Sequence, residues 1–334
     1  MSLHILSHLP DNFFSNTPST LNRLFSDGTL ICLEGERKDP LFLSCLLHGN
    51  ETSSFYAVRQ LLQNLQRLPR SLMIFFGNVT AAAQGLRQVP HGPDFNRIWA
   101  GGNTPEEQMA TEIRDFAKAN HVWGSIDMHN NTGDNPYYAC INKRDRATLA
   151  LASLFSDKML FFEKPHQAQS IAFGQFCTSI TLECGKSGDQ IGVARLTRYL
   201  EKVLSLPSFD EINLCYAEIS AFKTVGRILL TQEIEVDFKF DPSSNSHLSF
   251  LPELEKYNFQ LIKTGTVLAK LQKALNEACH LKVVDNADRD VTEKYFYQKQ
   301  NNLIVANDFT PAMLTKDIRV AKDDCLGYIL ENLT

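Results

Sequence analysis

The amino-acid sequence predicts an α/β fold, in which a mixed, largely parallel sheet flanked by helices is followed by a smaller β-rich C-terminal domain. Short apolar runs alternate with helical patterns through the first two-thirds of the 334 residues, which is typical of parallel strands joined by helices. After about Pro207 the helical periodicity becomes sparse, and pieces rich in Val, Ile, Phe and Thr alternate with turn signals. We therefore predict a larger α/β domain over residues 1–207 and a β-rich domain over residues 208–334.

Four apolar runs of the first domain have the length of buried strands. Each is followed by polar or small residues, which mark the expected end of the strand. The predicted strands are Leu41–Leu47, Leu72–Phe76, Ser125–Met128 and Thr178–Leu182.

Three helices are predicted around these strands. The first covers Thr52–Leu65, and its N-cap is Thr52 or Ser53. The second covers Thr104–Ala119 and opens with a capping threonine, a proline and two acids, which suit the first turn and the positive end of the helix dipole. The third, Gln190–Leu204, is amphipathic.

The second domain is expected to contain short strands. Residues Leu268–Cys279 fit a helix or a strand, and the sequence leaves this open. The strand-like pieces are Arg227–Leu230, Glu233–Phe240 and Asn301–Val305, with a turn at Asp241–Asn245.

Composition argues against several classes of partner. A formal net charge of −5 without a cluster of Lys and Arg argues against nucleic acid. No stretch approaches the ~20 apolar residues that span a bilayer, and the N-terminus carries no secretory signal, so no membrane partner is expected. The eight cysteines are scattered, as is usual for reduced, buried residues. We therefore predict a cytoplasmic protein, and the formation of a homo-oligomer stays open.

Residues capable of chemistry follow all four predicted strands. His48 and Glu51 follow the first, Gly77-Asn78 the second, His129 the third and Glu183 the fourth. Ligands of open parallel sheets bind outside the carboxyl ends of the strands, so we expect these side chains at one edge. Two imidazoles and a carboxylate with an open fourth position form the ligand set of many catalytic zinc sites. A second carboxylate can take a proton from water and deliver it to a leaving amine.

Each of these residues alone has a plainer interpretation. His-x-x-Glu is a common spacing, and a histidine after an apolar run is often a hydrogen-bonded boundary residue. Glu183 could instead complement the dipole at the start of the next helix. The metal-site hypothesis depends on all four residues having the same relative place in successive βα units.

A loop rich in Pro and Gly follows the second strand and carries Arg87, Asn96 and Arg97. A guanidinium group presents a planar fork to a substrate carboxylate, and one arginine could instead stabilise a developing oxyanion. The alternative for either arginine is an ion pair with Asp94 on a solvated loop.

Five short motifs occur along the chain in the order His48-Gly-Asn-Glu51, Gly77-Asn78, Asp94-Phe-Asn96-Arg97, Asp127-Met-His129-Asn130 and Thr181-Leu-Glu183-Cys-Gly185. In this order they resemble the succinylglutamate desuccinylase/aspartoacylase family, a branch of the zinc carboxypeptidase-like fold. The resemblance covers roughly residues 40–205.

The resemblance implies zinc-dependent hydrolysis of a small N-acyl amino acid, such as an N-acyl aspartate or N-succinyl glutamate, with one Zn²⁺ in each chain. The first domain would be the zinc-hydrolase catalytic domain. By resemblance, His48, Glu51 and His129 are the zinc ligands, and Glu183 is the general base and acid. Asp127 lies on the same strand face as His129 and is expected to support it.

The resemblance also implies roles in substrate recognition. Arg87 resembles the arginine that polarises the scissile carbonyl. Asn96 and Arg97 resemble the pair that grips a substrate carboxylate, and we count Asn130 and Lys164 as further substrate-binding residues.

The identity of the substrate does not follow from the resemblance. The stretch Gln88–Phe95 makes the arginine loop about two residues longer than is usual in the family. The stretch Lys164–Leu182 lacks the arginine that helps aspartoacylases to bind an acidic amino acid, and Lys164 and His166 are the nearest basic residues. The C-terminal stretch Asn307–Met313 lacks the family's substrate-binding tyrosine.

Two other functions compete with an amidohydrolase. A carboxypeptidase acting on peptides would use the same metal and base, and a non-catalytic binding module would keep the fold alone. The Asn96-Arg97 pair favours the amidohydrolase over the carboxypeptidase. The presence of Glu183 argues against the binding module.

Overall fold

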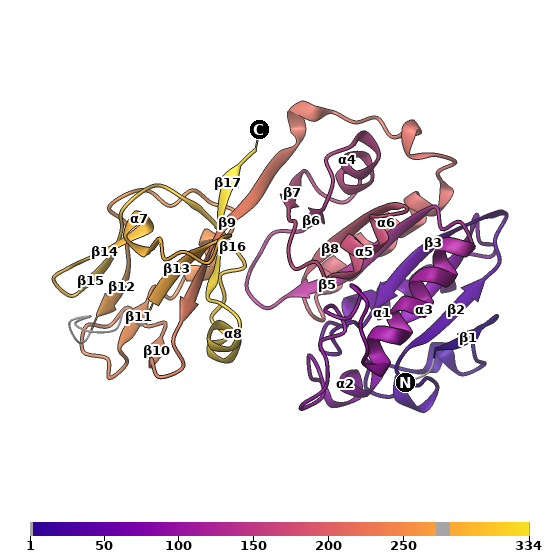
Figure 1. Ribbon diagram of the computed structural model, residues 1–334, viewed down its shortest axis with the longest axis horizontal. Coiled ribbons are helices and arrows are strands. Elements are labelled where there is room, and N and C mark those ends of the chain that lie inside the picture. The colour runs from indigo at the N-terminus through magenta and orange to yellow at the C-terminus, as the bar shows by residue number, and fades with distance from the viewer. Residues whose placement is uncertain (1–2, 272–280, 334) are drawn as a thin grey trace. The chain divides into compact units, whose positions relative to one another are not determined.

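The computed structural model describes residues 3–271 and 281–333 (Figure 1). The chain divides by its internal contacts into two compact units. The first comprises Met1–Asn130 and Tyr137–Ser220, and the second comprises Asn131–Pro136 and Ala221–Thr334.

A sheet forms the centre of the first unit. Its strands are β1 (His4–Leu6), β2 (Thr29–Leu33), β3 (Arg37–Cys45), β4 (Arg70–Phe76), β5 (Gly124–Asn131), β6 (Tyr138–Ile141), β7 (Lys158–Phe161) and β8 (Thr178–Lys186). They lie in the order β1-β2-β4-β3-β5-β8-β6-β7. The pairs β1–β2, β3–β4, β3–β5 and β6–β7 are parallel, whereas β2–β4 and β6–β8 are antiparallel. The prediction of a mixed, largely parallel sheet is confirmed.

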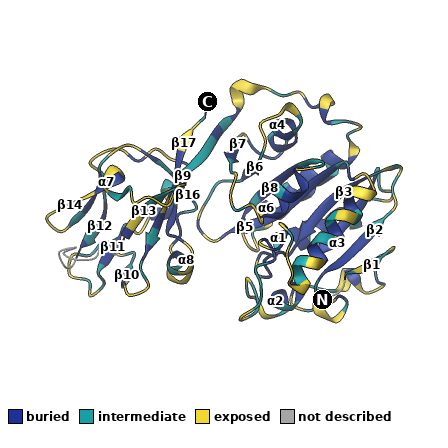
Figure 2. Ribbon diagram, in the orientation of Figure 1, coloured by how far each residue is buried: buried dark blue, intermediate teal, exposed yellow. Residues whose placement is uncertain are grey.

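Helices cover both faces of this sheet. They are α1 (Ser53–Asn64), α2 (Val79–Gln84), α3 (Pro105–Ala119), α4 (Arg146–Ser153), α5 (Gln169–Phe173) and α6 (Gln190–Ser205), with 3-10 turns η1 (Phe13–Ser15), η2 (Leu21–Arg23), η3 (Phe209–Glu211) and η4 (Tyr216–Glu218). On one face, Phe42 of β3 and Phe75 of β4 pack in a common apolar cluster with α3 and α5. On the other face, Phe76 contacts Phe55 of α1, and α1 packs against α6. Because both faces are covered, every residue of β4 and β5 is buried (Figure 2).

The predicted helices are present, and their starts are set by caps. Thr104 and Glu107 form the reciprocal capping box at the start of α3, with Pro105 as its first residue. Thr52 is the N-cap residue of α1, but its side chain makes no capping bond. The side chain of Asn130, on β5, instead accepts a hydrogen bond from the backbone N–H of Ser53.

Two strands are longer than predicted. β5 continues to Asn131 and β8 continues to Lys186, so His129 and Glu183 lie within strands and not after them. The predicted strands end at the last apolar residue, Met128 or Leu182, whereas backbone pairing in the sheet continues through the polar residues that follow. The alternative in which Glu183 complements a helix dipole is therefore wrong, because α6 begins only at Gln190.

The second unit is rich in β-structure, as predicted. Its elements are β9 (Ser220–Leu230), β10 (Val236–Asp237), β11 (Leu248–Phe250), β12 (Val267–Leu271), β13 (Leu281–Asp285), β14 (Phe296–Lys299), β15 (Asn302–Val305), β16 (Thr310–Ala312), β17 (Gly327–Asn332), α7 (Thr292–Tyr295), α8 (Ile318–Asp323) and η5 (Leu254–Tyr257). Strand β9 pairs with β13 and β17, and β17 pairs with β16. The other strands form a sheet in the order β10-β11-β12-β15-β14.

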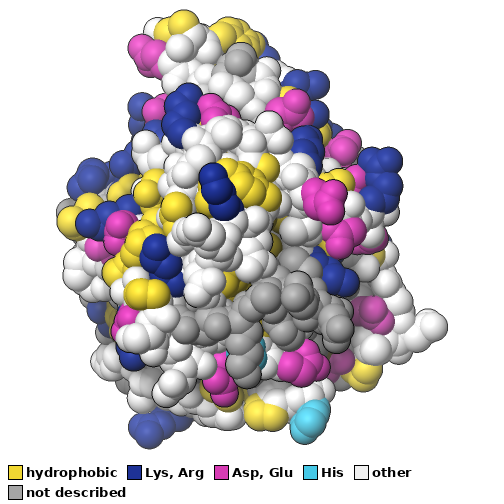
Figure 3. All heavy atoms as spheres, turned by 90° about the vertical axis from the view of Figure 1, so that its left-hand side faces the viewer, with side chains coloured by type: hydrophobic (Ala, Val, Ile, Leu, Met, Phe, Trp, Pro, Cys, Tyr) yellow, Lys and Arg dark blue, Asp and Glu magenta, His cyan; other side chains and the backbone are white. Residues whose placement is uncertain are grey.

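One apolar cluster holds the second unit together and takes side chains from both of its strand groups, such as Ile228 and Phe250. Of the stretch Leu268–Cys279, the part Leu268–Leu271 belongs to β12, and residues 272–279 lie outside the described part of the chain. The surface in Figure 3 shows hydrophobic side chains interspersed with charged side chains of both signs. Among residues 3–271 and 281–333, no helix has the length and hydropathy that crossing a membrane requires.

Candidate metal centre

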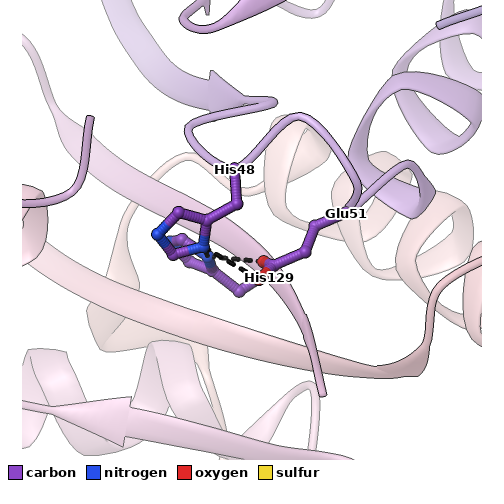
Figure 4. Close-up of side chains that lie close together, drawn as sticks. All are labelled: His48, Glu51 and His129. Carbon is purple, nitrogen blue, oxygen red and sulfur yellow. Dashed lines mark hydrogen bonds and ion pairs between the residues drawn. The ribbon is translucent and has the colours of Figure 1, made fainter. Parts of the chain in front are cut away.

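Three potential metal ligands converge at the edge of the first sheet. His48 and Glu51 lie on the turn between β3 and α1, and His129 lies near the end of β5. Because β3 and β5 are parallel neighbours, their carboxyl ends lie side by side. The side chains of the three residues point toward one another (Figure 4), and one ligand atom from each lies within 4.8 Å of the others.

The turn that carries two of these residues depends on a glycine. A β-carbon at Gly49 would lie 2.2 Å from the backbone nitrogen of Ala82 in α2. The Gly49 N–H donates to the carbonyl of Arg87 at 3.0 Å, which holds the turn against the arginine loop. Gly49 is therefore needed because the turn approaches the backbone of α2 too closely for a β-carbon.

The spacing of the donor atoms fits a tetrahedral metal ion. His48 Nδ1 lies 2.8 Å from Glu51 Oε1, His129 Nδ1 lies 2.7 Å from Glu51 Oε2, and the two Nδ1 atoms are 3.1 Å apart. Zinc bonds of about 2.0–2.1 Å in tetrahedral geometry place ligand atoms about 3.3 Å apart. Small outward shifts of the three side chains would thus admit the ion.

The opposite nitrogen of each imidazole contacts a carboxylate. His48 Nε2 lies 3.0 Å from Asp94 Oδ1, and His129 Nε2 lies 2.9 Å from Asp127 Oδ2. Ser44 of β3 donates a hydrogen bond of 2.6 Å to the other oxygen of Asp127. Such carboxylates fix the ring orientation and leave Nδ1 free to bind a metal. The sequence predicted the support from Asp127, but it considered Asp94 only as a partner of an arginine.

The titration of the cluster also suits a cation. Burial raises the pKa of Glu51, but the charges and hydrogen bonds of His48 and His129 outweigh burial and hold this pKa well below its ordinary value. Burial lowers the pKa of His129, but Asp127 and Glu51 outweigh it and raise this pKa well above its ordinary value. The carboxylates therefore favour positive charge at the place where the two rings meet.

Glu183 lies on β8, the neighbour of β5, and is half-buried. Burial raises its pKa to about 8; His129 and Arg87 oppose the shift, and the negative charges of Glu51 and Asp127 add to it. The Glu183 carboxylate forms no hydrogen bond with another described residue, so its pKa is shifted by burial and by nearby charges. Glu183 is thus close enough to interact with the cluster, and its carboxylate is not committed to another group.

Arg87 lies beside the cluster on the loop after α2. Its Nη2 atom donates to Asp94 Oδ2 at 3.0 Å, and its Nη1 atom lies 3.6 Å from Glu51 Oε1. The side chain of Arg87 remains 45% exposed. The ion pair with Asp94, the plainer alternative for this arginine, is present, and Arg87 also lies near the candidate metal centre. Its role toward a substrate stays a prediction.

The amide groups of two predicted substrate ligands are engaged within the protein. Asn96 accepts a hydrogen bond from the Gln169 N–H at 3.0 Å, and its Nδ2 lies 3.1 Å from His129 Nε2. Asn130 donates to Ser53 Oγ and to the Gly185 carbonyl, both at 2.9 Å, and accepts from the Ser53 N–H. These contacts support a structural role for both residues, and their substrate roles stay predictions.

The two remaining predicted substrate residues are exposed. Arg97 follows Asn96 and donates a hydrogen bond of 3.0 Å to the Asn96 carbonyl. Lys164 lies between β7 and α5 and precedes a cis peptide bond to Pro165. The substrate roles of Arg97 and Lys164 also stay predictions.

Comparison with known proteins identifies the family. Residues 38–207, just over half of the chain, match the model of the succinylglutamate desuccinylase/aspartoacylase catalytic domain. The chain belongs to this family. The succinylglutamate desuccinylase of Shewanella frigidimarina is 24% identical over 279 residues, covering 74% of this chain and 77% of that protein.

Solved structures with related names share the fold. A succinylglutamate desuccinylase/aspartoacylase from Rhodobacter sphaeroides matches with a TM-score of 0.60 and 14% identity, covering 90% of this chain and 88% of that one. The succinylglutamate desuccinylase of Chromobacterium violaceum has a TM-score of 0.56 and 19% identity, with coverages of 89% and 85%. Murine aminoacylase 3 has a TM-score of 0.55 and 18% identity, with coverages of 89% and 95%. All three cover parts of both units, because each extends over most of the chain.

Proposed function

We propose that this chain is a zinc-dependent amidohydrolase that cleaves a small N-acyl amino acid into a carboxylate and a free amino acid. The observation that carries the proposal is the buried cluster of His48, Glu51 and His129, with the uncommitted carboxylate of Glu183 beside it. The family supports the reaction class, and the names of its relatives, a succinylglutamate desuccinylase and an aminoacylase, support an acyl amino acid as the substrate.

His48, Glu51 and His129 would hold the zinc ion through two Nδ1 atoms and a carboxylate. When bound, zinc supplies Lewis acidity, which makes a water molecule more acidic and a carbonyl carbon more electrophilic. Asp94 and Asp127 keep the two rings in the tautomer that offers Nδ1 to the metal.

Glu183 is the proposed general base and acid. It takes a proton from the attacking water as the new C–O bond forms, and it gives this proton to the amide nitrogen as the C–N bond breaks. The base must be ionised, so kcat/KM falls as the pH drops through the pKa of Glu183. That pKa is about 8 without a metal, and a nearby metal cation would lower it.

Arginine side chains would supply the remaining contacts. The guanidinium group of Arg87 lies 3.6 Å from Glu51, and this partly exposed side chain would donate hydrogen bonds to the carbonyl oxygen as negative charge develops there. Arg97 is exposed on the same loop and is the proposed partner of a substrate carboxylate.

The decisive variant is Glu183→Gln, with Glu112→Gln on the exposed side of α3 as the matched control. We expect Glu183→Gln to retain about one zinc per chain and to lose about 10²–10⁴-fold in kcat. The control should keep both properties. Free amine released from zinc-loaded protein by a panel of N-acetyl- and N-succinyl-amino acids measures activity, and elemental analysis measures zinc.

Three results would contradict the proposal or part of it. Purified protein that cannot be loaded with stoichiometric zinc would contradict the proposed role of the metal. Full activity of Glu183→Gln would contradict the proposed role of Glu183 as the general base. Release of C-terminal residues from peptides, without hydrolysis of any N-acyl amino acid, would instead make the chain a carboxypeptidase.

A further inference from the structure

We propose that Asp94 is the positioning residue that fixes Arg87 beside the metal ligands, so that one carboxylate sets the orientation of both an imidazole and the guanidinium group. This inference rests on the proposed function in assigning Arg87 a place at the scissile carbonyl. The arrangement of the three side chains, however, can be tested without catalysis.

The two oxygens of Asp94 have different partners. Oδ1 lies 3.0 Å from His48 Nε2 and accepts the backbone N–H of Asn96 at 2.7 Å. Oδ2 accepts Nη2 of Arg87 at 3.0 Å. A rotation of the carboxylate that moved one oxygen would break the contact at the other, so the positions of His48 and Arg87 are coupled through this single group.

Asp94 is itself held firmly. The residues that follow it, Phe95, Ile98 and Trp99, are buried in the apolar cluster beneath α3. The Trp99 indole N–H also donates to the Phe95 carbonyl at 2.7 Å. The carboxylate therefore projects from an anchored segment, although the loop as a whole is irregular.

Asp94 makes the shorter of the two contacts that join the Arg87 side chain to carboxylates at this place. The Arg87 side chain is 45% exposed, and an arginine side chain has several rotatable bonds. Of its two carboxylate contacts, the one with Asp94 at 3.0 Å has hydrogen-bond length, whereas the one with Glu51 at 3.6 Å is longer. A metal ion would also compete for Glu51, whereas Asp94 contacts His48 at the ring nitrogen that faces away from the candidate metal position.

The longer loop does not separate the pair. Between Arg87 and Asp94 the chain turns back on itself, because the Gly92 N–H donates to the Val89 carbonyl at 2.9 Å. The Gln88 side chain also donates to the Gly92 carbonyl at 3.1 Å. The residues that lengthen this loop are thus taken up in a closed turn, and Arg87 and Asp94 meet across its base.

The first experiment measures the position of Arg87 without any substrate. Zinc-loaded wild-type protein, Asp94→Asn and Asp115→Asn are treated with phenylglyoxal, and the modification of each arginine is followed by peptide mass spectrometry. Asp115 pairs with Arg114 on exposed α3 at 3.8 Å, so its variant is the matched control. We expect Arg87 to react several-fold faster in Asp94→Asn and at the wild-type rate in Asp115→Asn.

The second experiment is a double-mutant cycle with Asp94→Asn, Arg87→Ala and the double variant, all at saturating zinc. We expect Arg87→Ala to lower kcat about 10²–10³-fold, as for the loss of one oxyanion donor. The double variant should be nearly as active as Arg87→Ala alone, because the carboxylate acts through the arginine. Millimolar methylguanidinium should partly restore kcat of Arg87→Ala, and it should fail with the double variant.

A third measurement separates this role from metal retention. Zinc affinity, determined by competition with a chelator, is expected to fall about 10–100-fold in Asp94→Asn, because the carboxylate also orients His48. Saturating zinc should restore stoichiometry without restoring kcat.

Equal reactivity of Arg87 in wild-type protein and in Asp94→Asn would overturn the proposal. So would losses of kcat that multiply in the double variant, or a full recovery of Asp94→Asn by added zinc. A wild-type protein that holds zinc and hydrolyses no N-acyl amino acid would contradict the proposed function, whereas the phenylglyoxal result would still decide the position of Arg87.

Discussion

The metal-ligand cluster and the cationic groups proposed to face the substrate differ in how the protein holds them. His48, Glu51 and His129 are buried and lie on a strand or on the turn that closes one, and each has further contacts with the protein. Arg97 and Lys164 are exposed, on irregular segments. The difference teaches that this scaffold fixes the proposed metal ligands in advance, whereas the proposed substrate contacts are side chains that can be exchanged with little effect on the stability of the fold.

Removal of a ligand tests the buried side of this comparison and has the largest expected effect. We expect His129→Ala to lose both zinc and measurable hydrolysis, and to unfold at a lower temperature, because Asp127 and Glu51 lose a hydrogen-bonded partner in a buried place. Zinc content, amine release and thermal unfolding measure the three effects.

The matched control is His8→Ala, at an exposed histidine near the N-terminus. It should leave all three properties unchanged. Normal zinc binding by His129→Ala would show that His129 is not a required metal ligand. The contrast between the buried cluster and the exposed cationic residues would then lose its basis.

The pH dependence of metal binding is the second prediction. The pKa of His129 is raised well above its ordinary value in the metal-free protein, so at neutral pH the ring holds a proton that zinc must displace. Below that pKa, zinc affinity should therefore rise about tenfold for each pH unit, with release of about one proton per ion.

Chelator competition at several pH values between about 6 and 8 measures the slope, and calorimetry in buffers of different ionisation enthalpy measures the proton. The pKa of Glu51 is lowered, so this residue is already ionised over the same range and contributes no slope. An affinity independent of pH would show that His129 does not carry the proton.

The sequence predicts the features of the fold and the site that depend on local patterns, and it misses those that depend on contacts between distant residues. The alternation of apolar runs and helical patterns predicts the mixed sheet, because each run buries a strand between helices. The positions of His48 and His129 near the ends of parallel neighbours predict that they meet. These are consequences of local pattern and of simple sheet topology.

Contacts that depend on distant parts of the chain could not be predicted in this way. His129 lies inside a strand beside Asp127, which contacts its ring and also accepts a hydrogen bond from Ser44, 83 positions away in sequence. The contact of Asp94 with His48 spans 46 positions and a loop of irregular conformation. The periodicity of hydrophobic residues cannot predict the contact between Asp94 and His48. Asp94 does, however, belong to one of the family motifs.

The segment Asn131–Pro136 is a similar case. It begins with the last residue of the strand that carries His129, yet it packs with the second unit. There, Glu255 accepts the Asp134 N–H at 3.2 Å and Asn258 donates to the Asp134 carbonyl at 3.0 Å. Only tertiary contacts show this, because the segment has the composition of an ordinary loop.

The smallest expected effects on catalysis compare a predicted substrate residue from each region. Arg97→Ala removes an exposed cation, so we expect KM to rise about 10-fold with little change in kcat, zinc content or unfolding temperature.

Asn130→Ala removes both donors and the acceptor of a buried amide that joins α1, β5 and β8, so we expect the free energy of unfolding to fall by about 1–3 kcal/mol. Its KM should stay within about twofold of wild type, because no part of that amide is left for the substrate's charge. Steady-state kinetics and thermal unfolding of both variants, with Asn96→Ala as the intermediate case, measure the contrast. A rise of KM in Asn130→Ala without a loss of stability would show instead that its amide serves the substrate, and the boundary between the fixed scaffold and the exchangeable groups would then lie inside β5.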